Sequence, residues 1–259
     1  MDSPAGVSAI PAPTDTLTLQ PPVRLGMLTP SSNTVLEPVV AAMLRDAPGV
    51  SAHFSRFRVL QISMGADSQS QFDPEPMLAA ADLLADARVH AICWNGTSAG
   101  WLGFEQDERL CAAITARTGI PAQSAVLGFN ALFAERGLKR LGLVSPYIAD
   151  VQRRIIANYA AIGIETVADE RLGIAENFAF AAVTEDTIAA LCRRVAEARP
   201  DGIAIYCTNV DGAALAPRLE RELGIPVYDS GAVALWAGLR AAGASLAPFA
   251  RWGRLFGAA

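Results

Sequence analysis

The chain has 259 residues, of which 52% are hydrophobic and 18% are charged, and its formal net charge is −5. This length and composition suit one large α/β domain or two smaller ones with a substantial core. No long basic run occurs, so we expect neither nucleic acid nor a membrane surface as a partner, and no apolar stretch is long enough to span a bilayer.

The first segment, residues 1–22, reads MDSPAGVSAIPAPTDTLTLQPP. It lacks the basic start and apolar core of a secretory signal, and its composition predicts a flexible tail. The four cysteines show no CxxC pair and no regular spacing, so we expect free thiols in a reducing cytoplasm. Taken alone, each is most simply explained as a small buried apolar residue. They are Cys93, Cys111, Cys192 and Cys207.

Short, continuous apolar runs, typical of strands covered on both faces, alternate with helical patterns along the rest of the chain. The patterns PEPMLAAADLLADAR and EDTIAALCRRVAEARP carry helix-start signals at Pro76 and Thr184. Alternating strands and helices predict parallel sheets. The predicted strands are Arg24–Thr29, Phe57–Ile62, Val89–Trp94, Pro121–Ser124, Arg140–Val144, Glu165–Leu172, Gly202–Cys207 and Pro226–Asp229.

This plan occurs twice in the chain. RLGMLTPSSNTVLEPVVAAM resembles RLGLVSPYIADVQRRIIANY, GTS at Gly96 matches CTN at Cys207, and TGIPAQSAVLGFNALFAERGL resembles LGIPVYDSGAVALWAGLRAAG. Three matches in the same order indicate an internal duplication. We therefore predict an α/β fold of two pseudo-symmetric parallel-sheet lobes with an active-site cleft between them. The predicted lobes are residues 23–125 and 126–230, and residues 231–259 are expected to form a helix and tail that pack back on the first lobe.

Polar segments stand at the predicted strand ends, where parallel α/β sheets bind their ligands. These segments are 30–33 (PSSN), 96–98 (GTS), 146–147 (PY) and 207–209 (CTN). Each leads into a helical pattern, so free backbone N–H groups and helix dipoles should converge on the cleft. This arrangement predicts a receptor for a small carboxylate.

Cys207 is the candidate for chemistry at this cleft. A strand end that precedes a helix can lower a thiol pKa from its usual value of about 8.5, and such a thiol can exchange a proton with carbon. The alternative is a buried core cysteine. The only histidines, His53 and His90, lie away from strand ends, so we expect no catalytic triad and no metal site. No phosphate-binding glycine motif occurs, so we expect no nucleotide cofactor.

Several other side chains have two readings. Asn33, Tyr147 and Asn177 can bind a ligand, or they can serve turn geometry and packing. Asp73 and Glu75 stand at a helix start, where capping is the expected role. A tryptophan that faces the cleft would suit an aromatic substituent, with core packing as the alternative. The tryptophans concerned are Trp94, Trp101 and Trp236.

Together these features resemble the aspartate/glutamate racemase superfamily, and within it the maleate isomerase and arylmalonate decarboxylase branch. The resemblance rests on PSSNTVLEP, GTS, CTN and GIPVYDSGAVALW, and WNGTSAGW is similar to ectoine-utilisation proteins of that branch. It covers residues 23–256. It implies two pseudo-symmetric lobes, cofactor-independent chemistry at a carbon next to a carboxylate, and a homodimer.

The resemblance also implies roles for particular residues. Racemases and maleate isomerases use one cysteine per lobe; the second falls on Cys207, and the first falls on Gly96. Arylmalonate decarboxylases share this glycine–cysteine pattern. The carboxylate-binding positions of the branch map onto Asn33, Thr97, Ser98, Tyr147 and Thr208, and Asn177 matches a further polar pocket position.

Glycine has no titratable group, so two-base inversion lacks one of its two proton donors. Maleate isomerisation needs a nucleophile and a second group to complete the reaction, and it lacks one of these. One thiol still suffices for protonation from one face. The first expectation is therefore a cofactor-independent, decarboxylase-like enzyme acting on a small carboxylate or dicarboxylate, with Cys207 as proton donor. The alternatives are a maleate-isomerase-like or racemase reaction and a non-catalytic carboxylate-binding protein. Cys93 precedes Gly96 by three residues and is not expected to replace the missing thiol.

Overall fold

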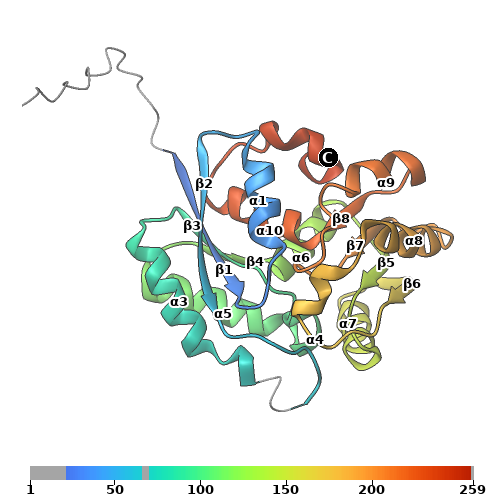
Figure 1. The fold of residues 1–259 in the computed structure, drawn as a ribbon, viewed down its shortest axis with the longest axis horizontal. Helices are drawn as coiled ribbons and strands as arrows, with labels where there is room; N and C mark the ends of the chain where they lie inside the picture. Colours follow the sequence, from blue (N-terminus) through green and yellow to red (C-terminus); the bar gives the residue numbers. More distant parts are fainter. Residues whose placement is uncertain (1–21, 66–69, 258–259) are drawn as a thin grey trace, which may run out of the picture.

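The structure is a computed structural model that describes residues 22–65 and 70–257, so the tail predicted over 1–22 falls outside the described residues apart from Pro22. Two four-stranded parallel sheets have the same strand order, β2-β1-β3-β4 and β6-β5-β7-β8 (Figure 1). The duplicated α/β fold is confirmed. The first sheet comprises β1 (Val23–Pro30), β2 (Val50–Phe57), β3 (Ala91–Trp94) and β4 (Ala122–Ser124). The second comprises β5 (Arg140–Ser145), β6 (Glu165–Arg171), β7 (Gly202–Ile205) and β8 (Val227–Asp229).

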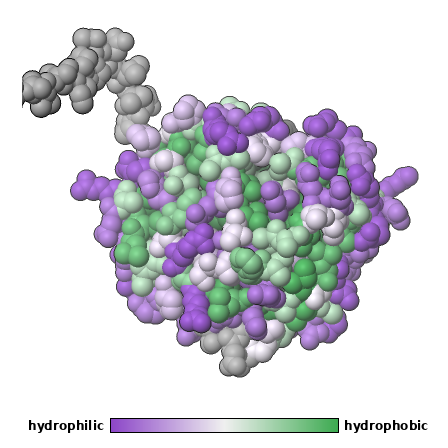
Figure 2. All heavy atoms as spheres, viewed as in Figure 1, coloured by the Kyte–Doolittle hydropathy of each residue, from purple (hydrophilic) through white to green (hydrophobic). Residues whose placement is uncertain are grey.

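Helices connect the strands of both sheets. They are α1 (Leu36–Leu44), α3 (Pro74–Asp86), α4 (Ala99–Leu102), α5 (Phe104–Thr118), α6 (Ala125–Glu135), α7 (Ala149–Ala161), α8 (Glu185–Ala196), α9 (Ala216–Leu223) and α10 (Ser230–Ala241). Short 3₁₀ turns are η1 (Ser70–Phe72), η2 (Phe178–Ala182), η3 (Ala247–Trp252) and η4 (Arg254–Phe256). None of the described helices is long and apolar enough to cross a membrane. On the face shown in Figure 2, hydrophilic side chains are concentrated toward the rim.

The predicted second strand, Phe57–Ile62, is wrong, because the strand is β2 at Val50–Phe57. Among the described strands, β2 is an edge strand that pairs only with β1, and most of its residues are half-buried, so its sequence VSAHFSRF contains no continuous apolar run. The apolar residues that follow it leave the sheet instead. The Ile62 N–H donates to the Ala175 carbonyl at 2.9 Å, and Gln61 forms an isolated bridge with Glu176, so this segment contacts the second lobe.

Two helices lie between the lobes and join them (Figure 1). α10 follows the second sheet but contacts β3 and β4 of the first. In return, α6 follows the first sheet and contacts the second lobe, with Phe129 stacked on Tyr206 at 5.2 Å between ring centroids. The two helices thus hold the strand ends of the two sheets in a fixed position relative to each other. The residue boundaries assigned to the lobes stay predictions.

Side chains at the N-cap position cap three of the described α-helices, α6, α8 and α10. Thr184 accepts a hydrogen bond from the Thr187 N–H, as predicted, and caps α8. Ser124 and Asp229 end the corresponding strands β4 and β8 and cap α6 and α10. The capping role expected for Asp73 and Glu75 is wrong: Asp73 precedes α3 without accepting a capping bond, and Glu75 pairs with Arg117 instead.

Candidate active site

A cavity of about 20 Å³ lies where the carboxyl ends of both sheets meet. A volume of this size holds about one water molecule. Seven of the eight predicted site residues line it, and the eighth, Asn33, donates to the Thr208 hydroxyl at 3.2 Å. The full lining is Pro30, Val59, Ile62, Phe72, Trp94, Gly96, Thr97, Ser98, Trp101, Tyr147, Asn177, Cys207 and Thr208.

Donors from both lobes face this cavity. Tyr147 follows β5 and Thr97 follows β3, and their hydroxyl oxygens lie 2.6 Å apart. Burial raises the pKa of Tyr147 well above its ordinary value, so the phenol stays protonated and can donate. The backbone N–H groups of residues 96–98 have no acceptor among the described residues. The arrangement can therefore bind a carboxylate through uncharged donors.

Thr208 and Asn33 play supporting parts. The Thr208 hydroxyl donates to the Asn95 carbonyl at 2.8 Å while it accepts from the Asn33 amide. The Asn33 side-chain oxygen in turn accepts from the N–H groups of Val35 and Leu36 at the start of α1. These side chains are engaged with protein partners, and they position the segment that carries Cys207.

Cys207 is 2% exposed. Burial raises its pKa to about 12, although the Tyr147 hydroxyl and the Asn209 N–H favour the thiolate, and the nearby Asp229 adds to the rise. The expected lowering of this pKa is therefore wrong, because desolvation outweighs the two hydrogen bonds. At neutral pH the residue is an uncharged thiol, which is the form that can give a proton.

The first-lobe counterpart, Gly96, lies beneath an indole ring. A Cβ atom added at Gly96 would fall 2.0 Å from Trp94 Cζ2 and 2.5 Å from Cε2. Cys93 does not fill the gap, because its buried Sγ donates to the Ala234 carbonyl of α10 at 3.3 Å and does not line the cavity. The second lobe thus contributes a thiol to the lining of the cavity, and the first lobe contributes an aromatic ring and no thiol.

Asn209 was not predicted as a site residue, although it belongs to the CTN segment. Its side-chain oxygen accepts from the Thr34 N–H at 2.9 Å and the Val35 N–H at 3.3 Å, and its amide donates to the Asn177 carbonyl at 2.6 Å. The Asn177 amide then donates to the Ser32 hydroxyl at 2.7 Å. This network ties the loop after Cys207 to the end of β1 in the other lobe.

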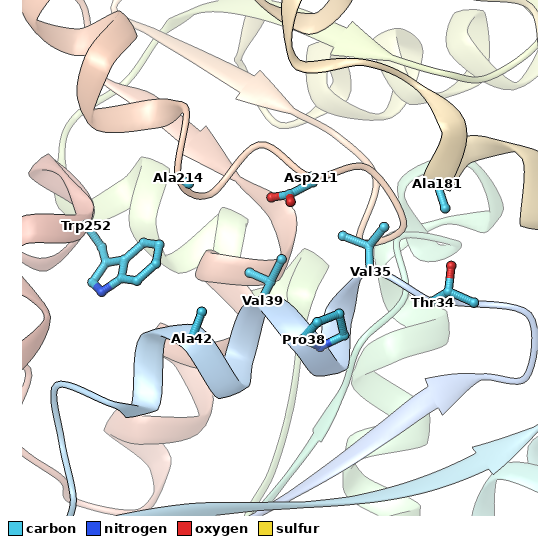
Figure 3. A pocket seen from close by; sticks show the side chains of 9 residues that line it. All are labelled: Thr34, Val35, Pro38, Val39, Ala42, Ala181, Asp211, Ala214 and Trp252. Atoms are coloured by element: carbon cyan, nitrogen blue, oxygen red, sulfur yellow. The ribbon is translucent and has the colours of Figure 1, made fainter.

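A larger cavity, of about 350 Å³, lies beside α1 (Figure 3). Its walls are mostly apolar, and its carboxylate, Asp211, has a pKa raised by burial and by the nearby Glu185. An acidic side chain among apolar walls does not suit an anionic substrate. His53 and His90 line neither cavity, and no cluster of three or more His, Cys, Asp or Glu residues suited to a metal occurs in the described part of the chain.

The family model for arylmalonate decarboxylase matches residues 35–256. The chain belongs to the arylmalonate decarboxylase family. It is 29% identical over 241 residues to the arylmalonate decarboxylase of Bordetella bronchiseptica, with 90% of this chain and 95% of that protein covered. It is 26% identical to the maleate isomerase of Nocardia farcinica, with 84% of this chain and 89% of that protein covered.

Solved structures of the same two kinds share the fold. A liganded arylmalonate decarboxylase mutant, in which a glycine became cysteine and a cysteine became serine, has a TM-score of 0.78 at 25% identity, with 91% of this chain and 99% of that chain covered. The Nocardia farcinica maleate cis-trans isomerase, in a cysteine-to-serine mutant with a bound succinylcysteine intermediate, has a TM-score of 0.82 at 22% identity, with 90% and 98% covered. Membership of this branch is therefore confirmed.

Proposed function

We propose that the protein is a cofactor-independent decarboxylase of small substituted malonates, with Cys207 as its single proton donor. The observation that carries the proposal is a buried, protonated thiol that lines the same cavity as Gly96, where no second thiol stands. A thiol of this kind is an acid rather than a nucleophile at neutral pH. Gly96 offers no second acid, so protonation comes from one face only.

The reaction divides the cavity into two parts. One carboxylate binds the Tyr147 hydroxyl and the backbone N–H groups of residues 96–98, and the other lies against the apolar side chains of Val59 and Ile62. Apolar surroundings disfavour a carboxylate relative to neutral carbon dioxide, which promotes its loss. The carbon–carbon bond breaks, and its electron pair moves into the retained carboxylate as an enediolate that the donors stabilise.

Cys207 completes the reaction. Its Sγ–H protonates the former carboxyl-bearing carbon, and the thiolate left behind takes a proton from water. The net change is loss of carbon dioxide and gain of one solvent proton at carbon. Burial keeps the thiol protonated until the enediolate forms, and the hydrogen bonds from the Tyr147 hydroxyl and the Asn209 N–H stabilise the thiolate that the transfer leaves.

A maleate-isomerase-like reaction is the second candidate, supported by the 26% identical relative. It would require Cys207 to add to an alkene as the thiolate, and burial opposes that form. A homodimer and a cytoplasmic location stay predictions.

Proton NMR in deuterated buffer tests the proposal on methylmalonate, phenylmalonate, maleate and aspartate. We expect the malonates to lose carbon dioxide and gain one deuterium, and we expect Cys207→Ala to abolish this. Fumarate formed from maleate would overturn the decarboxylase assignment in favour of isomerisation. Binding without turnover of any compound would favour a carboxylate-binding protein.

A further inference from the structure

One buried carboxyl group near the catalytic cavity has no part in the reaction proposed above. Asp107 lies in the first turn of α5, is 2% exposed, and does not line that cavity. A negative charge in the first turn stabilises a helix, but Glu105 already supplies one there from an exposed position. Interaction with the helix therefore does not explain why a second carboxyl group is buried at this point.

The neighbours of Asp107 indicate what its carboxyl group does. Burial raises the pKa of Asp107 to about 7, and hydrogen bonding by the Ser124 and Trp94 side chains offsets part of that rise. Trp94 Nε1 is a buried donor and Asp107 Oδ2 is a buried acceptor, and neither has another partner among the described residues. Unpaired polar atoms are unfavourable in a protein interior, so the indole N–H and the carboxyl oxygen satisfy each other.

The same indole ring forms part of the catalytic cavity. Trp94 lines the cavity together with Gly96, and a Cβ atom at Gly96 would fall 2.0 Å from Cζ2 and 2.5 Å from Cε2. Cε2 is the carbon bonded to Nε1, so the part of the ring that lies against Gly96 is next to the nitrogen that Asp107 engages. A ring that loses this hydrogen bond can move away from Gly96 and from the backbone that follows it.

We propose that Asp107 is a positioning residue for the reaction: it accepts a hydrogen bond from the Trp94 indole N–H and so holds the ring against Gly96. This inference rests on the proposed function, in which the backbone N–H groups of residues 96–98 bind the retained carboxylate. The ring fixes the segment that carries these donors. A misplacement of about 1 Å at a reacting centre can lower a rate roughly 100-fold, so Asp107 affects the enediolate without touching the substrate.

Indole ¹H–¹⁵N correlation NMR of the full chain tests the hydrogen bond itself. The chain has four tryptophans, and Trp94→Phe identifies the signal of Trp94 by its loss. We expect this signal to move upfield in Asp107→Leu, which removes the acceptor, and to stay near its place in Asp107→Asn, which keeps an acceptor oxygen. Glu108→Leu is the matched control, because Glu108 is the next residue of α5 and is exposed, and it should leave the signal unchanged. An unmoved signal in Asp107→Leu would overturn the proposal.

The effect on the reaction is measured as kcat and KM for methylmalonate, well below the melting temperature of each variant. Asp107→Leu should lower kcat roughly 10- to 100-fold and change KM less, because the donors bind most strongly once charge has moved into the retained carboxylate. Asp107→Asn should restore most of the lost rate. Removal of the negative charge alone would affect both variants equally, and a loss of stability alone would leave kcat of the folded enzyme unchanged, so either result would overturn the positioning role.

A second replacement keeps the test valid if the Asp107 variants fold poorly. Incorporation of 3-benzothienylalanine at position 94 keeps the shape of the ring and places a sulfur where tryptophan has its N–H. We expect the same loss of kcat as in Asp107→Leu, and an undiminished kcat would overturn the proposal.

Calorimetric binding of acetate separates this inference from the proposed function. If the unaltered protein turns over no malonate, decarboxylation is refuted, and the carboxylate donors are then tested by binding alone. Acetate bound about tenfold more weakly by Asp107→Leu, but not by Asp107→Asn, would support the positioning role, a loss that corresponds to one hydrogen bond to a charged group. Equal acetate affinities in the unaltered protein and Asp107→Leu, or no acetate binding at all, would refute it. Turnover of methylmalonate that ignores Asp107→Leu would refute the positioning role and leave decarboxylation standing.

Discussion

Gly96→Ala adds the one atom that the indole of Trp94 excludes. The added Cβ would lie 2.0 Å from Cζ2 and 2.5 Å from Cη2, whereas carbon atoms prefer a separation of about 3.5–4.0 Å. The ring must therefore move by more than about 1 Å. It is fully buried against Phe57, so relief requires repacking of the core.

Overpacking of this kind typically destabilises a protein by about 1–3 kcal/mol. We expect Gly96→Ala to lower the melting temperature by about 2–4 °C for each kcal/mol. Gly49→Ala is a control, because a Cβ there meets no atom within 4 Å. It should leave stability unchanged or raise it slightly.

A double-mutant cycle with Trp94→Leu identifies the cause, because leucine lacks the clashing ring atoms. Urea unfolding should show Gly96→Ala to be about 1–3 kcal/mol less harmful beside Trp94→Leu than alone. Gly96→Ala with wild-type stability, or additive effects in the cycle, would refute the reasoning. The same steric argument predicts that Gly96→Cys alone does not provide a second proton donor.

Three further outcomes follow from the buried groups. Because Cys207 is an uncharged buried thiol, iodoacetamide should label it at least about 100-fold more slowly than a free thiol at pH 8, and fast labelling of the folded protein would contradict its raised pKa. Burial raises the pKa of Asp107 in the folded state to about 7, against an ordinary value of 3.8. Between these two values the folded state keeps a proton that the unfolded state releases. The free energy of unfolding therefore falls as the pH rises from about 4 to 7. Asp107→Asn should make that slope shallower by up to about 1.4 kcal/mol per pH unit in urea unfolding, and an unchanged slope would contradict the shift. Asn209→Ala should destabilise the protein by about 2–4 kcal/mol because it removes one buried and two part-buried hydrogen bonds, whereas Asn158→Ala removes one part-buried bond and should have a smaller effect; equal losses would show that the Asn209 network is unimportant.

The sequence predicts the architecture well where strands are buried on both faces. β1, β3, β5 and β7 are continuous apolar runs, and the internal repeat then predicts the lobes. β2 is missed because an edge strand needs no apolar run, and the buried Ile62 of the segment after it bonds to Ala175 of the distant second lobe. Burial that depends on long-range packing has no local signature.

The same limit applies to the site. Strand ends bring Thr97, Tyr147 and Cys207 to one cavity, as the strand-end rule leads one to expect. The sign of the Cys207 pKa shift was predicted wrongly, because sequence position indicates the helix dipole but not the degree of desolvation. The position of the Trp94 ring over Gly96 depends on side-chain packing between elements, which sequence spacing does not encode.

The central claim is that protonation occurs from one face, by Cys207. The most direct test is the enantiomeric composition of the product formed from the prochiral substrate 2-methyl-2-phenylmalonate, measured by chiral chromatography for the unaltered protein and for Cys207→Ala. The account predicts one enantiomer from the unaltered protein and no catalysed product from the variant. A racemic product, or the same enantiomer formed at an undiminished rate by Cys207→Ala, would contradict it.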